Sequence, residues 1–89
     1  MPVVSIPTAY RAPTEGKALV ETSGNDVITC LRDVERQHPG FLELVLDPAG
    51  DVHPFVKLFI NGAEIEREAL ETRVVESDRI EVLAAIAGG

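Results

Sequence analysis

The chain has 89 residues, of which 45% are hydrophobic, so it can bury one small core and has no room for a second. Fifteen acidic against eight basic side chains give a formal net charge of -7, which repels nucleic acid and anionic membrane surfaces. The sequence shows neither a secretory signal nor an apolar run of membrane-spanning length. These properties predict a cytoplasmic protein without nucleic acid or membrane partners.

Two short apolar runs predict a hairpin near the start of the chain. Residues 3–7 and 17–22 carry alternating or clustered apolar side chains, and Gly and Ser residues flank the second run. The connecting tip, from Ala9 to Gly16, contains Pro13 and is long for a tight turn. We therefore expect this tip to project into solvent.

A helix is predicted from a cap at Asn25 or Asp26 to about His38, where Pro39-Gly40 ends the run. The short polar side chains at its start can accept hydrogen bonds from free backbone N–H groups. Apolar residues recur at three- and four-residue spacing, so one face should meet a sheet. These residues are Val27, Cys30, Leu31 and Val34.

The second half of the chain predicts one short helix and up to three strands. Residues 41–47 favour a short helix, and the nearly continuous apolar run at 55–60 is typical of a strand in the middle of a sheet. Asn61-Gly62 is a signal for a type I′ hairpin turn, with residues 63–66 as the return strand. After an acidic, mostly irregular segment, the alternation at 79–85 predicts a last strand with one buried face.

This order of elements is typical of a β-grasp, or ubiquitin-like, domain of the α+β class. In such a domain a mixed sheet of four to five strands packs on one main helix. We predict this domain over residues 1–85, followed by a flexible tail over 86–89 that ends in Gly-Gly.

No residue pattern in the chain predicts catalysis. His38 and His53 each stand beside a proline without metal-ligand spacing, so we interpret them as loop histidines. The single cysteine, Cys30, cannot form an internal disulfide, and its place on the apolar side of the predicted helix favours core packing. Phosphate-binding and nucleophile motifs are also missing from the sequence. We expect no enzyme, no metal and no bound cofactor.

The remaining candidate for chemistry is the Gly88-Gly89 end. Two residues without Cβ atoms can thread a narrow channel and leave the terminal carboxylate of Gly89 accessible. A carboxylate is a poor electrophile until it becomes an acyl-adenylate, from which a sulfur nucleophile can displace AMP to leave a thiocarboxylate. The alternative interpretation is a frayed terminus without function.

Nearly the whole chain resembles the ubiquitin-like sulfur carriers, the MoaD, ThiS and CysO proteins. FVKLFING at 55–62 resembles the family's strand and Asn-containing turn. ESDRIEVLAAIAGG at 76–89 resembles the family's acidic turn, last strand and Gly-Gly end. VSIPT at 4–8, with Arg11 soon after it, most resembles the CysO subgroup.

The resemblance implies a carrier that is a co-substrate of partner enzymes. An E1-like adenylyltransferase would use ATP to adenylate Gly89, a rhodanese or other sulfur donor would form the thiocarboxylate, and a synthase would accept the sulfur. In the CysO subgroup the acceptor is a cysteine synthase, and a metalloprotease then releases cysteine. Synthases of other sulfur metabolites or of molybdopterin stay open. Ser77 and Ala84-Ala85 argue against molybdopterin, because many MoaD-like members have Gly and Pro-Pro there.

Two further functions remain as alternatives. A protein modifier would join the activated Gly89 to lysines of target proteins. A non-covalent binding module would present its sheet to a larger enzyme. The partner contacts that we predict are Leu83, Ile86 and Phe59, with Phe55 as a further candidate, and core packing is the alternative role of both phenylalanines.

Overall fold

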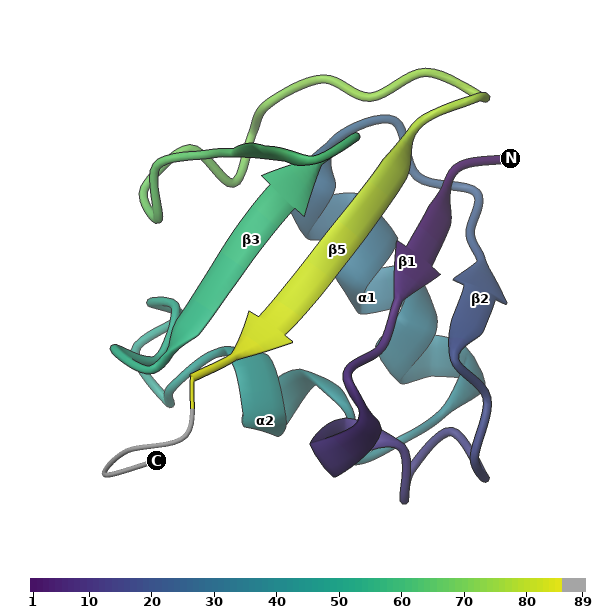
Figure 1. Ribbon diagram of the computed structural model, residues 1–89, viewed down its shortest axis with the longest axis vertical. Helices are drawn as coiled ribbons and strands as arrows, with labels where there is room; N and C mark the ends of the chain where they lie inside the picture. Colours follow the sequence, from purple (N-terminus) through teal and green to yellow (C-terminus); the bar gives the residue numbers. More distant parts are fainter. Residues whose placement is uncertain (86–89) are drawn as a thin grey trace.

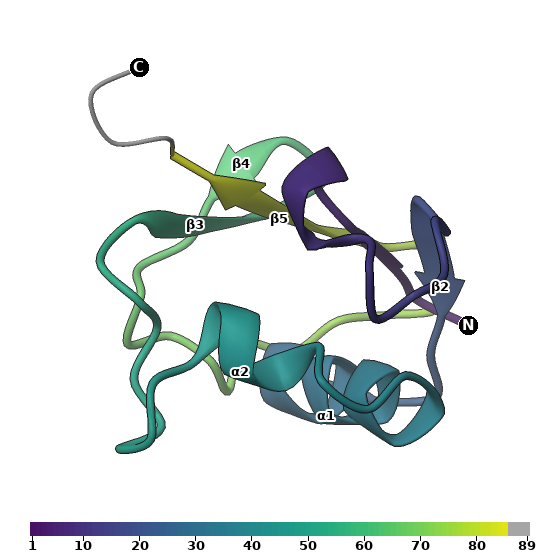
Figure 2. The same ribbon diagram turned by 90° about the horizontal axis from the view of Figure 1, so that it is seen from below.

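Residues 1–85 are described by the structure, a computed structural model, and they form two layers (Figures 1 and 2). One layer is a five-stranded mixed sheet, and the helices α1 and α2 cover one of its faces. Among residues 1–85, no helix is long and apolar enough to cross a bilayer. The elements follow one another as β1 (Val3–Ser5), the 3₁₀ helix η1 (Thr8–Tyr10), β2 (Leu19–Glu21), α1 (Val27–Gln37), α2 (Leu42–Val45), β3 (Val56–Ile60), β4 (Ala63–Glu64) and β5 (Arg79–Ala84). The predicted tail at 86–89 lies outside the described residues.

The strand order β2-β1-β5-β3-β4 puts β5 at the centre of the sheet. There it runs parallel to β1, whereas all other neighbours are antiparallel. β3 is an interior strand, as the apolar run at 55–60 predicts, but the middle position belongs to β5. Asn61 and Gly62 have φ angles of 51° and 87°, which fit the predicted turn. The return strand predicted over 63–66 is too long, because β4 contains two residues. Beyond β4, the side chain of Arg67 bonds to the carbonyl of Val56 on β3.

The prediction that the hairpin tip projects into solvent is wrong in part. Thr14 is fully buried, and its hydroxyl donates to the carbonyl of Lys17 at 2.9 Å. The guanidinium of Arg11 bonds to the carbonyl of Ile6 at 3.0 Å. The strands β1 and β2 pair over three residues each. The long connection between them folds back on the domain, and these hydrogen bonds satisfy its polar groups.

Helix α1 begins at a capping box. The carboxylate of Asp26 accepts from the Thr29 N–H at 2.9 Å, and the Thr29 hydroxyl accepts from the Asp26 N–H at 3.2 Å. Gly24 packs so closely on this first turn that a Cβ there would lie 2.6 Å from the Cys30 nitrogen. The helix ends at Gln37, so the predicted start and end are both confirmed.

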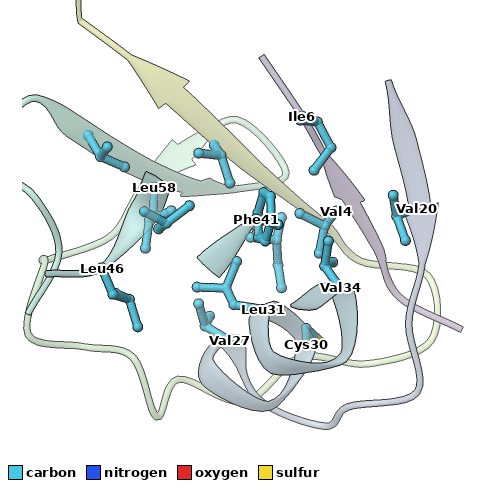
Figure 3. Packing of buried hydrophobic residues seen from close by; sticks show 14 of the residues in the cluster. Val4, Ile6, Val20, Val27, Cys30, Leu31, Val34, Phe41, Leu46 and Leu58 are labelled. Carbon is cyan, nitrogen blue, oxygen red and sulfur yellow. The ribbon is translucent and has the colours of Figure 1, made fainter. Parts of the chain in front are cut away.

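The core lies between the inner face of the sheet and the two helices (Figure 3). Phe41 precedes α2 and is fully buried, and α2 confirms the short helix predicted in 41–47. The four apolar positions predicted on α1 are all fully buried. Burial also raises the pKa of the Cys30 thiol, as expected for a cysteine that packs rather than reacts.

Candidate functional site

The outer face of the sheet, opposite the helices, carries two of the predicted partner contacts. Side chains alternate along a strand, so β5 points Ile80 and Val82 into the core and Leu83 outward. Leu83 is 50% exposed, and Phe59 on β3 is partly exposed. Phe55 is 45% exposed. Because neither phenylalanine belongs to the core cluster, the core-packing alternative is wrong for both.

Strand pairing brings these outward side chains together in one patch. Phe59 lies opposite Glu81 on β5 and Glu64 on β4, and Lys57 lies opposite Leu83. Phe59 and Leu83 are therefore diagonal neighbours across the two strands, within reach of one contacting partner. We call this group of five residues the outer patch. It has an apolar centre and more negative than positive charge at its rim.

The last described residue, Ala85, is tied to the start of β3. Its N–H donates to the carbonyl of Phe55 at 2.7 Å, so strand pairing continues to the exit of the chain toward its C-terminus. The ring of Phe55 stacks on His53 with 5.1 Å between centroids. The Nε2 atom of His53 lies 3.0 Å from the carbonyl oxygen of Glu43. The residue that holds Ala85 through its carbonyl thus carries a stacked aromatic side chain.

Three of the predicted site residues cannot be placed in this geometry. Ile86, the third partner contact, and the reacting pair Gly88 and Gly89 lie outside the described residues. Leu83 is the predicted site residue that the structure places nearest to them along the chain. The outer patch and the exit at Ala85 are consequently the described parts of the site.

A second pair of residues organises the opposite end of β5, and sequence reasoning missed it. The Asn61 amide donates to the Asp78 carboxylate at 2.8 Å and accepts from the Arg79 N–H at 2.9 Å. Asp78 also accepts from the Val75 N–H at 2.8 Å. The sequence pattern indicates a turn at Asn61 and no partner for its side chain. A signal was present in the sequence. Asn61 lies in the segment 55–62 and Asp78 in the segment 76–89, and both segments resemble the sulfur-carrier family.

The two histidines lie at the end of α1 and in the loop before β3. His38 caps the C-terminus of α1, where its N–H bonds to the Val34 carbonyl at 2.7 Å, and its side chain is buried. His53 lies in the loop before β3. Within residues 1–85, no group of three His, Cys, Asp or Glu side chains is arranged to hold a metal ion.

A mixed five-stranded sheet with a parallel β1–β5 pair at its centre and one main helix across it defines a β-grasp, or ubiquitin-like, domain of the α+β class. The protein belongs to the ThiS family, whose model matches residues 4–89. This assignment confirms the resemblance found in the sequence.

Individual relatives agree with the family assignment. The chain is 34% identical to the sulfur carrier protein CysO of Mycobacterium tuberculosis over 89 residues, which cover 97% of this chain and 96% of that protein. A chain in the crystal structure of the Amycolatopsis orientalis BexX/CysO complex superposes with a TM-score of 0.87 and 34% identity, with 100% of both chains covered. The small archaeal modifier protein 1 of Methanosarcina acetivorans has a TM-score of 0.83 at 24% identity, over 99% of this chain and 95% of that one, and shares the fold.

Proposed function

We propose that this protein is a sulfur carrier whose C-terminal Gly89 is adenylated by an E1-like enzyme and converted to a thiocarboxylate for biosynthesis. The observation that carries the proposal is the ThiS family match, which extends to Gly89 itself and so includes the Gly-Gly end. The full-length similarity to a sulfur carrier protein, CysO, supports the same conclusion. In this proposal residues 1–85 dock on partners and residues 86–89 react.

The proposed chemistry takes place at one carboxylate. A carboxylate oxygen of Gly89 attacks the α-phosphorus of ATP, pyrophosphate leaves, and an acyl-adenylate forms. Hydrosulfide then attacks the carbonyl carbon and AMP leaves, which gives the thiocarboxylate. With a persulfide donor such as a rhodanese, the product is an acyl disulfide, which a thiol cleaves to the thiocarboxylate. The partner enzyme binds ATP, and the carrier is its co-substrate.

The outer patch fits the docking step of this proposal. The apolar centre at Phe59 and Leu83 would contact the activating enzyme, and Ile86 is a further contact in this proposal. The net charge of -7 favours a partner surface with a basic rim. Docking there would bring the chain that follows Ala85 to the adenylation site.

The similarity to CysO favours a cysteine synthase as the acceptor of the sulfur. A CysO-like carrier would donate to a cysteine-synthase-like enzyme that acts on an activated serine, and a metalloprotease would then hydrolyse the bond between carrier and cysteine. A synthase of another sulfur metabolite or of molybdopterin would use the same thiocarboxylate. The partner that reacts with the loaded carrier distinguishes these outlets.

Intact-mass spectrometry tests the proposal. Incubation with a cognate E1-like enzyme, ATP and sulfide should raise the mass by about 16 Da, because one oxygen is exchanged for one sulfur. A chain that lacks Gly89 is the control and should keep its mass. An unchanged mass of the full chain with every cognate activating enzyme would contradict the proposal. A Gly89-dependent ladder of conjugates on blots of cells would favour the protein-modifier alternative.

A further inference from the structure

The guanidinium of Arg67 bonds to four backbone carbonyls at the start of β3. Its Nη1 donates to the carbonyl oxygen of Val52 at 3.1 Å, and the two N–H groups of Nη2 are shared among the carbonyl oxygens of His53 at 3.2 Å, Pro54 at 3.3 Å and Val56 at 3.1 Å. A planar guanidinium with five N–H donors can serve several acceptors at once, whereas an ammonium group acts as a compact point charge. One side chain thus holds a whole segment of the main chain.

Arg67 reaches this segment because it continues the pairing of β4 with β3. The Ile65 N–H bonds to the Leu58 carbonyl at 3.0 Å, just after β4 ends. The register of β3 and β4, extended by three residues beyond the pair of Phe59 and Glu64, sets Arg67 opposite Val56. There the side chain makes the bond that a strand would make, and it closes the open edge of β3.

The charged side chain of Arg67 binds these carbonyl oxygens and not a carboxylate of the described residues. Its sequence neighbours Glu66 and Glu68 are both acidic and exposed. Even so, among residues 1–85 no ion pair forms between Arg67 and a carboxylate. Hydrogen bonds from a charged donor are stronger than neutral ones, so the held segment gains a firm anchor.

The anchored segment is the one that holds the exit of the tail. Phe55 lies between the acceptors Pro54 and Val56, and its own carbonyl is turned the other way, toward the Ala85 N–H at 2.7 Å. We propose that Arg67 is a positioning residue that, through Phe55, fixes Ala85, the residue from which the chain continues to Gly89. This inference rests on the proposed function, since a fixed exit matters when a partner must receive Gly89.

Amide hydrogen exchange in the free, full-length protein tests the coupling without any partner. R67Q should raise the exchange rate of the Ala85 amide about tenfold or more relative to wild type, and the amide of Glu81 in the middle of β5 should change much less. R67K keeps the charge but not the fork of donors, so it should recover part of the protection. R73Q removes one positive charge from the same acidic segment at an exposed residue and should leave Ala85 unchanged.

Activation kinetics then test the consequence of the coupling for loading. With the cognate E1-like enzyme, R67Q should raise the KM for the carrier about tenfold, while kcat stays within about twofold. Arg67 acts on binding of the carrier, so a carrier that is already bound should still be adenylated at the normal rate. Exchange at Ala85 that stays at the wild-type rate, or that rises in parallel with Glu81, would overturn the inference, as would an unchanged KM. If wild type is never loaded, the proposed function fails, and the exchange experiment still decides whether Arg67 holds Ala85.

Discussion

Three aspartates hold backbone N–H groups at points where the chain changes direction. Asp26 accepts from Thr29 at the start of α1, and Asp33 accepts from the Ser23 N–H at 3.0 Å, which ties the segment after β2 to the helix. Asp78 bonds to the turn before β5. Each contact is stronger when the carboxyl group is ionised, because the ionised group accepts at both oxygens and carries the negative charge.

These contacts lower the pKa of all three carboxyls below the ordinary value of 3.8. The hydrogen bond from the Thr29 hydroxyl has the largest effect on Asp26. Burial by itself would raise the pKa of Asp33, but the bonds from Arg36 and from neighbouring donors outweigh it. For Asp78 the backbone N–H of the turn has the largest effect. The unfolded chain therefore binds more protons near these pKa values, and stability increases with pH there.

The first prediction at the residue scale concerns acid stability. The midpoint of thermal unfolding should be steady at about pH 6 and should fall between about pH 4 and about pH 2, as the carboxylates become protonated. D33N should show a smaller fall than wild type, since one of the responsible groups is gone. D51N changes an exposed loop residue and serves as the control. A midpoint that stays constant down to about pH 2 would contradict the assignment.

At the scale of the element, strand β5 joins the core to the candidate site. Its inward residues Ile80 and Val82 are buried, and its outward residue Leu83 lies in the outer patch two residues before Ala85. β1 on one side and β3 on the other hold the strand in place. A strand paired on both sides thus presents an apolar contact at a defined place relative to Ala85.

The prediction for this element is that Leu83 contributes to activation and little to stability. L83Q should lower kcat/KM for adenylation about tenfold, because an apolar contact is lost from an interface. The free energy of unfolding should change by less than about 0.5 kcal/mol, as for most surface substitutions. L19Q is the matched control, since Leu19 is 48% exposed and lies on the distant strand β2. Equal effects of the two substitutions on adenylation would count against the outer patch as the docking surface.

At the scale of the whole molecule, a chain of 89 residues carries a net charge of -7. Part of this charge lies on the outer face, where Glu64 and Glu81 flank Phe59. Charge keeps a small domain soluble wherever it lies on the surface. Charge at a docking face also attracts a partner of opposite sign, and this attraction depends on salt.

We therefore predict that association with the activating enzyme weakens with salt. The KM for the carrier should rise about tenfold between about 50 mM and about 500 mM NaCl, with little change in kcat. E81Q should reduce this dependence more than E43Q, because Glu43 belongs to α2 on the helix side. A KM independent of salt, or equal slopes for the two variants, would show that the charge does not guide docking.

The sequence by itself determined the elements whose burial is periodic. Apolar spacing of three and four residues marked α1, alternation marked β5, and Asn61-Gly62 marked the turn after β3, because a buried face or a positive φ restricts residue type locally. The exposed position of Leu83 follows from the same alternation. The resemblance to the sulfur carriers also came from the sequence, since the segments 4–8, 55–62 and 76–89 each resemble a part of that family.

The tertiary structure alone decided which distant residues meet. The bond between Asn61 and Asp78, the four carbonyl contacts of Arg67 and the tie between Phe55 and Ala85 join positions separated by 11 to 30 residues. Such contacts leave no periodic trace, because each depends on strand order and register rather than on local spacing. For the same reason, the central place of β5 and the exit it gives the chain became evident once the sheet was assembled.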